Sequence, residues 1–206
     1  STTSTNLTST TTIAKVGLLR LGELNSGQFD KSGNNTSYWT LTPYNTSKVC
    51  CVYYNGIADS NGVTNSNGGR PAINLKSSVK IVSGSGTASD PYRLKGDDDT
   101  PTSGTKLATR YSGEYIRFGT GENNLYRIVS HEILGTTKIV SATPLKESGG
   151  YLTMEFASSG VNYSSSNTIG AFLNGEYLTS GSYLTTDQVS MIEDNTMWYL
   201  GTVGDG

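Results

Sequence analysis

The chain has 206 residues, with 15 Lys and Arg against 17 Asp and Glu, and its formal net charge is -2. So balanced a charge leaves little basic surface for phosphate contacts, and it argues against nucleic acid as a main partner. Charged residues make up only 16% of the chain, whereas Gly occurs 25 times and Tyr 13 times against four Phe. This composition predicts many short strands joined by tight turns.

Other features of the sequence exclude several classes of protein. No apolar run approaches the roughly 18 residues that a membrane-spanning helix needs. The sequence begins at Ser1 without Met or a signal peptide, which predicts a processed or excised fragment. Cys50 and Cys51 are adjacent and have no partner elsewhere, so the sequence excludes a disulfide framework and a cysteine-based zinc site.

The predicted elements begin after a Ser- and Thr-rich tract at residues 1–12. We expect a mobile tail there, with an edge strand as the alternative. Apolar runs bounded by Gly, Asn and Pro then predict a short buried element and a series of strands. They cover residues 14–21, 38–42, 49–54, 70–75 and 79–82.

A linker is predicted at residues 96–106. This segment contains three consecutive aspartates (97–99) and Pro101, and it has no large apolar residue. The aspartates could also be taken for a calcium cluster. They lack the alternating spacing and terminal glutamate of an EF-hand loop, which favours the solvated linker.

Beyond the linker, strands are predicted at residues 114–118, 125–130 and 137–142. An apolar stripe at helical spacing then predicts a helix over residues 169–178, capped by Asn167 or Thr168. A second helix is predicted over residues 184–192, with Thr185 or Thr186 as N-cap, and a strand follows at 198–201. The chain is therefore expected to be mostly β with two short helices.

Three segments of the first half resemble a known module: YWTLTPY at 38–44, GGRPAINLKSSVKI at 68–81 and GSGTASDPYRL at 84–94. They are similar to the C-terminal half of a C-type-lectin-like (formylglycine-generating-enzyme-like) module of Gram-positive surface and pilin-like proteins. Segments at 111–116, 125–129 and 169–178 resemble its N-terminal portion. The resemblance implies an α+β fold of mixed sheets, circularly permuted or with halves swapped between neighbours.

The domain organisation follows from this resemblance. Residues 1–12 would be the tail, 13–95 the C-terminal half, 96–106 the linker and 107–206 the N-terminal half. Neither half is expected to fold alone, because units of roughly 90 residues bury little apolar surface. The first half supplies mostly strands and the second supplies the helices that could cover them, so we expect one composite core with the two ends of the chain close together.

Aromatic and amide side chains gather around the predicted hairpin at residues 38–61 and are suited to stacking on a sugar ring. The candidate ligand-binding residues are Trp39, Tyr44, Tyr53, Tyr54, Asn55 and Asp59, with Asn61 beside them. The alternative, which the sequence favours, is that Trp39 lies in the core and the tyrosines line a strand surface.

No catalytic, metal-binding or cofactor-binding residues are predicted. His131 is the single histidine, and no orienting carboxylate and nucleophile can be assigned to it, so an ordinary strand histidine is favoured over a catalytic base. Cys50 and Cys51 would point to opposite sides of a strand, which favours packing over reactivity. A formylglycine-generating activity, which needs reactive cysteines, ranks last.

Two functions remain as expectations from the sequence. The first is a non-enzymatic, extracellular structural subunit or repeat of a bacterial surface appendage, with neighbouring subunits as partners. The alternative is a lectin-like adhesin that binds a carbohydrate or host-surface ligand through the aromatic hairpin. The sequence predicts no cofactor, no nucleic acid and no membrane span.

Overall fold

The computed structural model describes residues 11–27, 35–95, 105–131 and 135–200. Strands account for 37% and helices for 17%, which confirms a mostly β protein with mixed sheets and few short helices. The lectin-like topology and the permuted order of the halves stay predictions. No helix in these ranges is long and apolar enough to cross a membrane.

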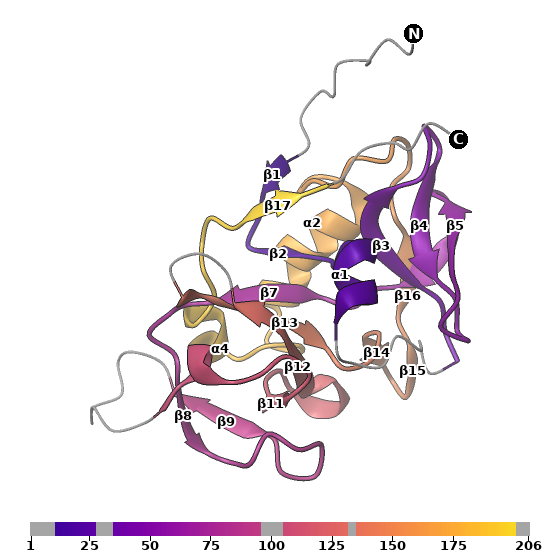
Figure 1. The fold of residues 1–206 in the computed structure, drawn as a ribbon. Coiled ribbons are helices and arrows are strands. Elements are labelled where there is room, and N and C mark those ends of the chain that lie inside the picture. The colour runs from indigo at the N-terminus through magenta and orange to yellow at the C-terminus, as the bar shows by residue number, and fades with distance from the viewer. Residues whose placement is uncertain (1–10, 28–34, 96–104, 132–134, 201–206) are drawn as a thin grey trace, which may run out of the picture.

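The main sheet has eight strands in the order β10-β8-β9-β11-β12-β13-β7-β2 (Figure 1). All neighbouring strands are antiparallel except β9 and β11, which are parallel. The strands are β2 (Val16–Gly17), β7 (Ala72–Leu75), β8 (Lys80–Ser83), β9 (Tyr92–Lys95), β10 (Thr105–Lys106), β11 (Tyr115–Arg117), β12 (Leu125–His131) and β13 (Thr137–Ser141).

A second sheet of five strands stands beside the first, in the order β16-β6-β3-β4-β5 (Figure 1). Its strands are β3 (Tyr38–Pro43), β4 (Lys48–Val52), β5 (Ala58–Gly62), β6 (Ser66–Gly68) and β16 (Thr153–Glu155). A short hairpin of β14 (Lys146–Glu147) and β15 (Gly150–Tyr151) precedes β16.

Arg70 connects the two sheets through hydrogen bonds. Its side chain is almost fully buried and donates to the carbonyls of Ser141 and Ala142 at 3.0 Å each. It also donates to the Tyr38 hydroxyl at 3.2 Å, and its guanidinium lies 5.0 Å from the centre of the Tyr38 ring. A buried charge needs several hydrogen-bond partners, and the partners of Arg70 come from both sheets. Arg70 therefore has a structural role.

Helices lie on both faces of the main sheet. In the view of Figure 1, α1 (Leu21–Ser26) lies in front of the sheet and α2 (Thr168–Asn174) behind it. The shorter helices are α3 (Glu176–Thr179) and α4 (Thr186–Ser190), with single 3₁₀ turns η1 (Leu107–Thr109) and η2 (Gly121–Asn123). The buried hydroxyls of Tyr126 on β12 and Tyr177 on α3 share a hydrogen bond, which joins the sheet to the helical layer.

The two ends of the described chain meet in a two-stranded ribbon. β1 (Thr11–Ile13) pairs antiparallel with β17 (Met197–Tyr199), so Thr11 lies opposite Tyr199 and Ile13 opposite Met197. The expected proximity of the chain ends is confirmed for these strands. Residues 11 and 12 of the predicted tail are part of the ribbon, because Thr fits a strand, and residues 1–10 lie outside the described residues.

A single core contains residues from both sides of the predicted linker, as expected. The first half contributes Ile73 and Trp39, and the second contributes Ile139 and Tyr177, all almost fully buried in one cluster. Both large sheets also mix strands from the two halves. The linker prediction needs one correction: Thr105 and Lys106 pair with β8 as the edge strand β10, while residues 96–104 with the three aspartates lie outside the described residues.

The helix predictions also need correction. The expected helix over residues 169–178 is interrupted at Gly175, whose backbone angles (φ -112°, ψ -101°) are not helical. The first half was expected to lack a helix, but it contains α1, which covers part of the sheet. The predicted caps at Asn167 and Thr185 are confirmed, since their side chains accept from the N–H groups of Gly170 and Gln188.

Candidate functional site

A cavity lies between α1, the ribbon and the face of the main sheet that carries Lys138. It has a volume of about 500 Å³, within the range of small-molecule sites. We call it the α1–β17 pocket. Its lining residues are Arg20, Glu23, Asn74, Ser77, Thr136, Lys138, Glu193, Asn195, Thr196, Met197, Trp198 and Tyr199.

The floor of the pocket comes from two neighbouring strands. Asn74 on β7 and Lys138 on β13 lie directly opposite each other in the antiparallel pair and therefore point to the same face. Both side chains are buried, although the residues around them in the two strands are mostly apolar.

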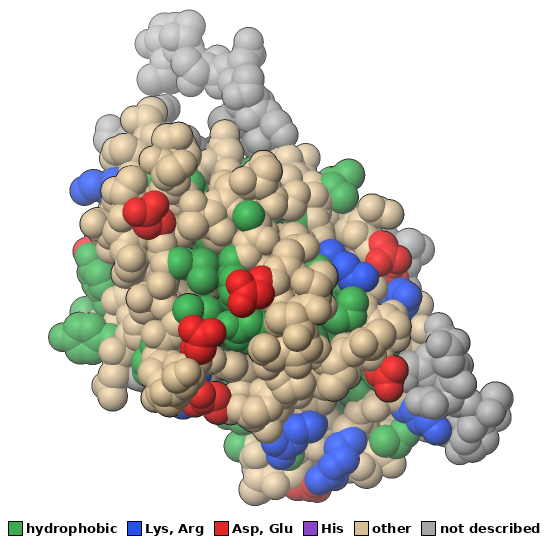
Figure 2. Space-filling model, turned by 180° about the vertical axis from the view of Figure 1, so that it is seen from behind, with side chains coloured by type: hydrophobic (Ala, Val, Ile, Leu, Met, Phe, Trp, Pro, Cys, Tyr) green, Lys and Arg blue, Asp and Glu red, His purple; other side chains and the backbone are tan. Residues whose placement is uncertain are grey.

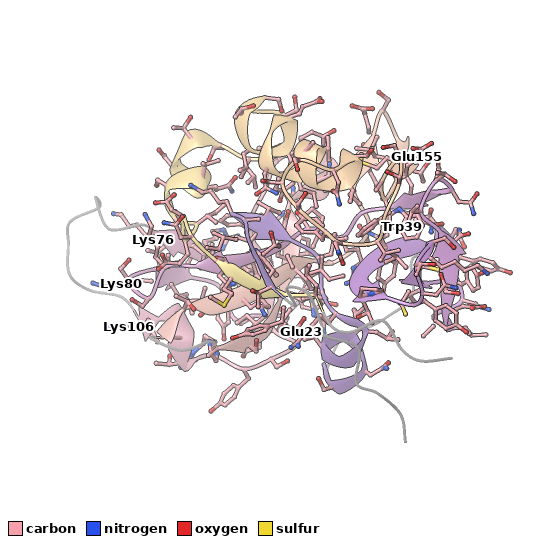
Figure 3. The ribbon with its side chains drawn as sticks, turned by 90° about the horizontal axis from the view of Figure 1, so that it is seen from above. Glu23, Trp39, Lys76, Lys80, Lys106 and Glu155 are labelled. Atoms are coloured by element: carbon pink, nitrogen blue, oxygen red, sulfur yellow. The ribbon has the colours of Figure 1, made fainter. Side chains whose placement is uncertain are left out.

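One wall of the pocket is formed by the start of α1, where charged side chains interact with one another. Glu23 accepts from the backbone N–H of Arg20 at 2.9 Å, which caps the helix, and its other oxygen lies 2.7 Å from Nζ of Lys138. Nε of Arg20 is 3.4 Å from the same carboxylate. Figure 3 labels Glu23 on the side of α1 that faces the centre of the molecule. The ion pair is largely shielded from solvent, with side-chain exposures of 15% for Glu23 and 11% for Lys138.

The opposite wall is β17. The indole of Trp198 is buried, donates to the carbonyl of Ala14 at 2.9 Å and packs over Gly17 of β2. Nζ of Lys138 lies 5.4 Å from the centre of the Trp198 ring system. Tyr199 is 55% exposed, and the Arg20 guanidinium lies 5.7 Å from the centre of its ring. The wall thus presents an aromatic ring at the mouth of the pocket.

Two buried polar atoms in the lining have no hydrogen-bond partner within the described part of the chain: Oδ1 of Asn74 and Oγ1 of Thr196. Asn74 is 5% exposed and Thr196 is 9% exposed. Leaving such an atom unsatisfied costs about 1–3 kcal/mol, so folded proteins rarely do it without a reason. Both atoms have almost no exposed surface, so they belong to the packed lining behind the surface of the cavity.

The residues predicted around the aromatic hairpin are only partly brought together. Trp39 is buried, packs against Phe156 with ring centres 5.7 Å apart and donates to the Met154 carbonyl at 2.9 Å, so it belongs to the core. Figure 3 places it far from the lysines at the other side of the molecule. Trp39 is therefore not available to a surface ligand.

The remaining predicted residues lie at opposite ends of β4. Tyr53, Tyr54 and Asn55 form the turn between β4 and β5, and Oδ1 of Asn55 accepts from the Ile57 N–H at 3.1 Å. Asp59 on β5 lies close enough that its charge is the largest cause of a raised Tyr53 pKa. Tyr44 instead precedes β4, where its N–H donates to the Lys48 carbonyl, so the whole length of β4 lies between it and Tyr54.

The other singled-out residues have structural partners. Nδ1 of His131 lies 3.0 Å from the Thr137 hydroxyl, and Nε2 lies 2.5 Å from the Arg110 carbonyl. Cys50 and Cys51 are free and buried in β4, and burial is the main cause of their raised pKa values. No group of three His, Cys, Asp or Glu side chains that could hold a metal was found in the ranges described.

Sequence reasoning missed every residue of the α1–β17 pocket, because four separate segments supply them. One signal was present. Asn74 interrupts the apolar run at 72–75, and Lys138 precedes Ile139 and Val140 in a strand that is buried throughout, where a charged residue is unusual unless it is paired. Only the folded register shows that the two positions face each other.

Comparison with known families gives one match. A family model described as a domain of unknown function (DUF6273) matches residues 5–77, which is less than half of the chain. The matched segment includes α1 and β7, and therefore Arg20, Glu23 and Asn74, whereas the pocket wall formed by β17 lies outside it. No curated protein matched the chain, and no solved structure did.

Proposed function

We propose that this protein is a non-enzymatic, extracellular binding domain that recognises a carbohydrate in the α1–β17 pocket. The observation that carries the proposal is the cavity of about 500 Å³, which is lined by polar side chains and by the aromatic residues Trp198 and Tyr199. Polar side chains can exchange hydrogen bonds with sugar hydroxyls, and a sugar ring can pack against the exposed ring of Tyr199.

The chemistry of the lining supports binding rather than catalysis. The ionisable groups Arg20 and Glu23 of the first wall and Lys138 of the floor are engaged with one another. Neither Cys nor His contributes to the lining. An arrangement of fixed polar groups beside an aromatic wall is typical of ligand recognition. The extracellular location is proposed from the composition, which is rich in hydroxyl and amide side chains.

The test is a glycan-array screen followed by calorimetric titration of the best glycan. Tyr199→Ala should weaken binding by about tenfold, which corresponds to about 1.4 kcal/mol of lost ring contact. Tyr54→Ala is the matched control, because Tyr54 is 60% exposed in the hairpin that holds the candidate residues from the sequence. If Tyr54→Ala loses binding and Tyr199→Ala does not, the binding site lies in the hairpin and not in the pocket. If no glycan on the array binds, the proposed function is wrong.

A second function, a structural subunit of a surface appendage, is favoured by the outer face of the ribbon. Ile13 and Met197 are direct cross-strand partners and are 60% and 54% exposed. An exposed apolar pair on a two-stranded ribbon is suited to packing against a neighbouring subunit. Sedimentation at rising concentration should show assembly that Ile13→Thr abolishes. Monomers at all concentrations would argue against this role.

A further inference from the structure

The five-stranded sheet ends in a long strand with an open edge. β5 is five residues long, and β4 is its only neighbour among the described strands. The other outermost strands of the two large sheets, β16, β10 and β2, have two or three residues in the ranges described. An open strand edge offers unpaired N–H and C=O groups to another strand. The length of β5 therefore makes it the edge of these sheets best suited to pairing with a second chain.

The hydrogen bonds of the β4–β5 hairpin show which backbone groups of β5 point outward. The Tyr53 N–H donates to the Ile57 carbonyl at 2.8 Å, and the Val63 N–H donates to the Ser47 carbonyl at 3.2 Å. Both bonds continue the register of β4 and β5, in which hydrogen-bonded and non-hydrogen-bonded pairs alternate. The backbone groups that point away from the sheet are therefore those of residues 58, 60 and 62.

Two of these three outward N–H groups are already hydrogen-bonded within β5. The Ser60 N–H donates to Oδ1 of Asp59 at 2.7 Å, and the Gly62 N–H donates to Oδ1 of Asn61 at 3.0 Å. In each case the acceptor belongs to the side chain of the preceding residue. The carbonyl of an incoming strand would have to displace that oxygen before it could pair with β5.

Further features hold or strengthen this arrangement. Nδ2 of Asn65, in the turn after β5, also donates to Asn61 Oδ1, at 2.5 Å, and so helps to fix the Asn61 side chain. Asp59 is exposed, so its carboxylate also places a charge on the edge. A test of the hydrogen bond must therefore separate it from the effect of the charge.

Other common protections of an edge strand are absent from β5. Its sequence, ADSNG, contains neither Lys nor Pro, and its pairing with β4 has no register shift that would mark a bulge. Figure 2 shows the molecule from behind, so that the edge at the right of Figure 1 lies at its left margin, where Lys and Arg side chains are sparse. The side chains of Asp59 and Asn61 are the features of β5 that can block pairing.

We propose that the hydrogen bonds of Asp59 and Asn61 keep the β5 edge from pairing with the β5 edge of a second copy of this chain. Two such edges could otherwise pair antiparallel about Ser60, because the outward N–H and C=O groups of Ser60 in each copy would meet those in the other. The two five-stranded sheets would then form one continuous sheet. This inference does not depend on carbohydrate binding, and assembly through the ribbon of β1 and β17 would leave the β5 edge unused.

The main experiment removes both acceptors from the full chain. Asp59→Ala and Asn61→Ala are combined with Ile13→Thr, so that the ribbon does not contribute to association. In sedimentation equilibrium, the self-association constant should rise by about tenfold over that of Ile13→Thr alone, which corresponds to about 1.4 kcal/mol. The physical reason is that two additional N–H groups in each copy become available to the other.

Two controls in the same Ile13→Thr background separate the hydrogen bond from the charge. Asp59→Asn with Asn61→Asp exchanges the two residues and keeps both side-chain oxygens and the net charge. Asp59→Asn alone removes the charge and keeps the oxygen. Neither control should associate more strongly than Ile13→Thr. Stronger association of Asp59→Asn alone would show that the charge protects the edge and would overturn the proposal.

Amide hydrogen exchange of the wild-type protein tests the same bonds without a variant. Relative to their intrinsic rates, the Ser60 and Gly62 N–H groups should exchange more slowly than the Ala58 N–H, which also points outward. Asp59→Ala should remove the protection of Ser60 and leave that of Gly62. Equal exchange of all three amides in the wild type would overturn the proposal even if the alanine variant did not fold.

A proline substitution locates the contact between the copies. Ser60→Pro removes the central outward N–H of the edge, so adding it to the associating variant should restore monomers. Association that persists in the presence of Ser60→Pro would place the contact elsewhere and contradict the proposal. A folded double alanine variant that remains as monomeric as Ile13→Thr would contradict it as well.

Discussion

Gly17 determines how closely the ribbon can approach the sheet. A Cβ atom at this position would lie 2.6 Å from the ring of Trp198, and a buried indole cannot move aside without losing its own packing. The wall of the α1–β17 pocket therefore depends on the absence of a side chain at this residue.

Gly17→Ala should lower the free energy of unfolding by about 1–3 kcal/mol, because it overpacks the contact between β2 and β17. Gly22→Ala is the matched control: no atom lies within 4 Å of its Cβ position, and alanine favours helix α1 by about 1 kcal/mol. Urea denaturation of both variants checks the prediction. Equal stability of Gly17→Ala and the wild type would show that the ribbon does not pack as described.

The buried thiol of Cys51 makes stability depend on alkaline pH. Burial, followed by the charges of Asp59 and Cys50, raises its pKa from 9.0 to about 11. Between these values the unfolded chain releases the proton while the folded chain keeps it. This contribution to stability is therefore complete below pH 9 and is lost as the pH rises to about 11.

We expect the free energy of unfolding to fall between pH 9 and pH 11 more steeply in the wild type than in Cys51→Ala. Denaturation midpoints at several pH values provide the measurement. The thiols should also resist iodoacetamide at pH 8 in the folded protein and react after unfolding. Parallel pH profiles for the two proteins would mean that Cys51 is not protected in this way.

Among the elements, α1 depends most on a single side chain. Glu23 closes the first turn through the Arg20 N–H and holds the buried ammonium of Lys138. Glu23→Ala should destabilise the protein by about 2–3 kcal/mol, because it leaves Lys138 without its carboxylate. Glu147→Ala, at an exposed glutamate, should change stability by less than about 0.5 kcal/mol. Thermal unfolding of both variants distinguishes the two roles.

The elements also show what the sequence could predict. Apolar runs with clear turn residues predicted β3, β4, β12 and β13, and side-chain caps predicted the starts of α2 and α4. β5 was missed because its sequence, ADSNG, has the composition of a turn and pairs with β4 through its backbone. α1 was missed because its six residues are too few for a helical period and its stability comes from Glu23 and from packing on β3.

For the molecule as a whole, long-range pairing explains why the candidate site was not predicted. Asn74 lies opposite Lys138 only because β7 pairs with β13. The wall formed by β17 likewise depends on its pairing with β1, at the other end of the described chain. The sequence offered the hairpin around Tyr53 as a candidate site because those residues are neighbours along the chain. Sequence patterns report local structure well and contacts between distant segments poorly.

The central claim is that the α1–β17 pocket binds a carbohydrate. The most direct test is a titration of the isotope-labelled protein with the glycan selected on the array, followed by amide chemical shifts. We predict shifts confined to the pocket, led by Asn74, Thr196 and Tyr199, with those of Tyr53 and Tyr54 unchanged. Shifts centred on the β4–β5 turn, or none at saturating glycan, would contradict the account.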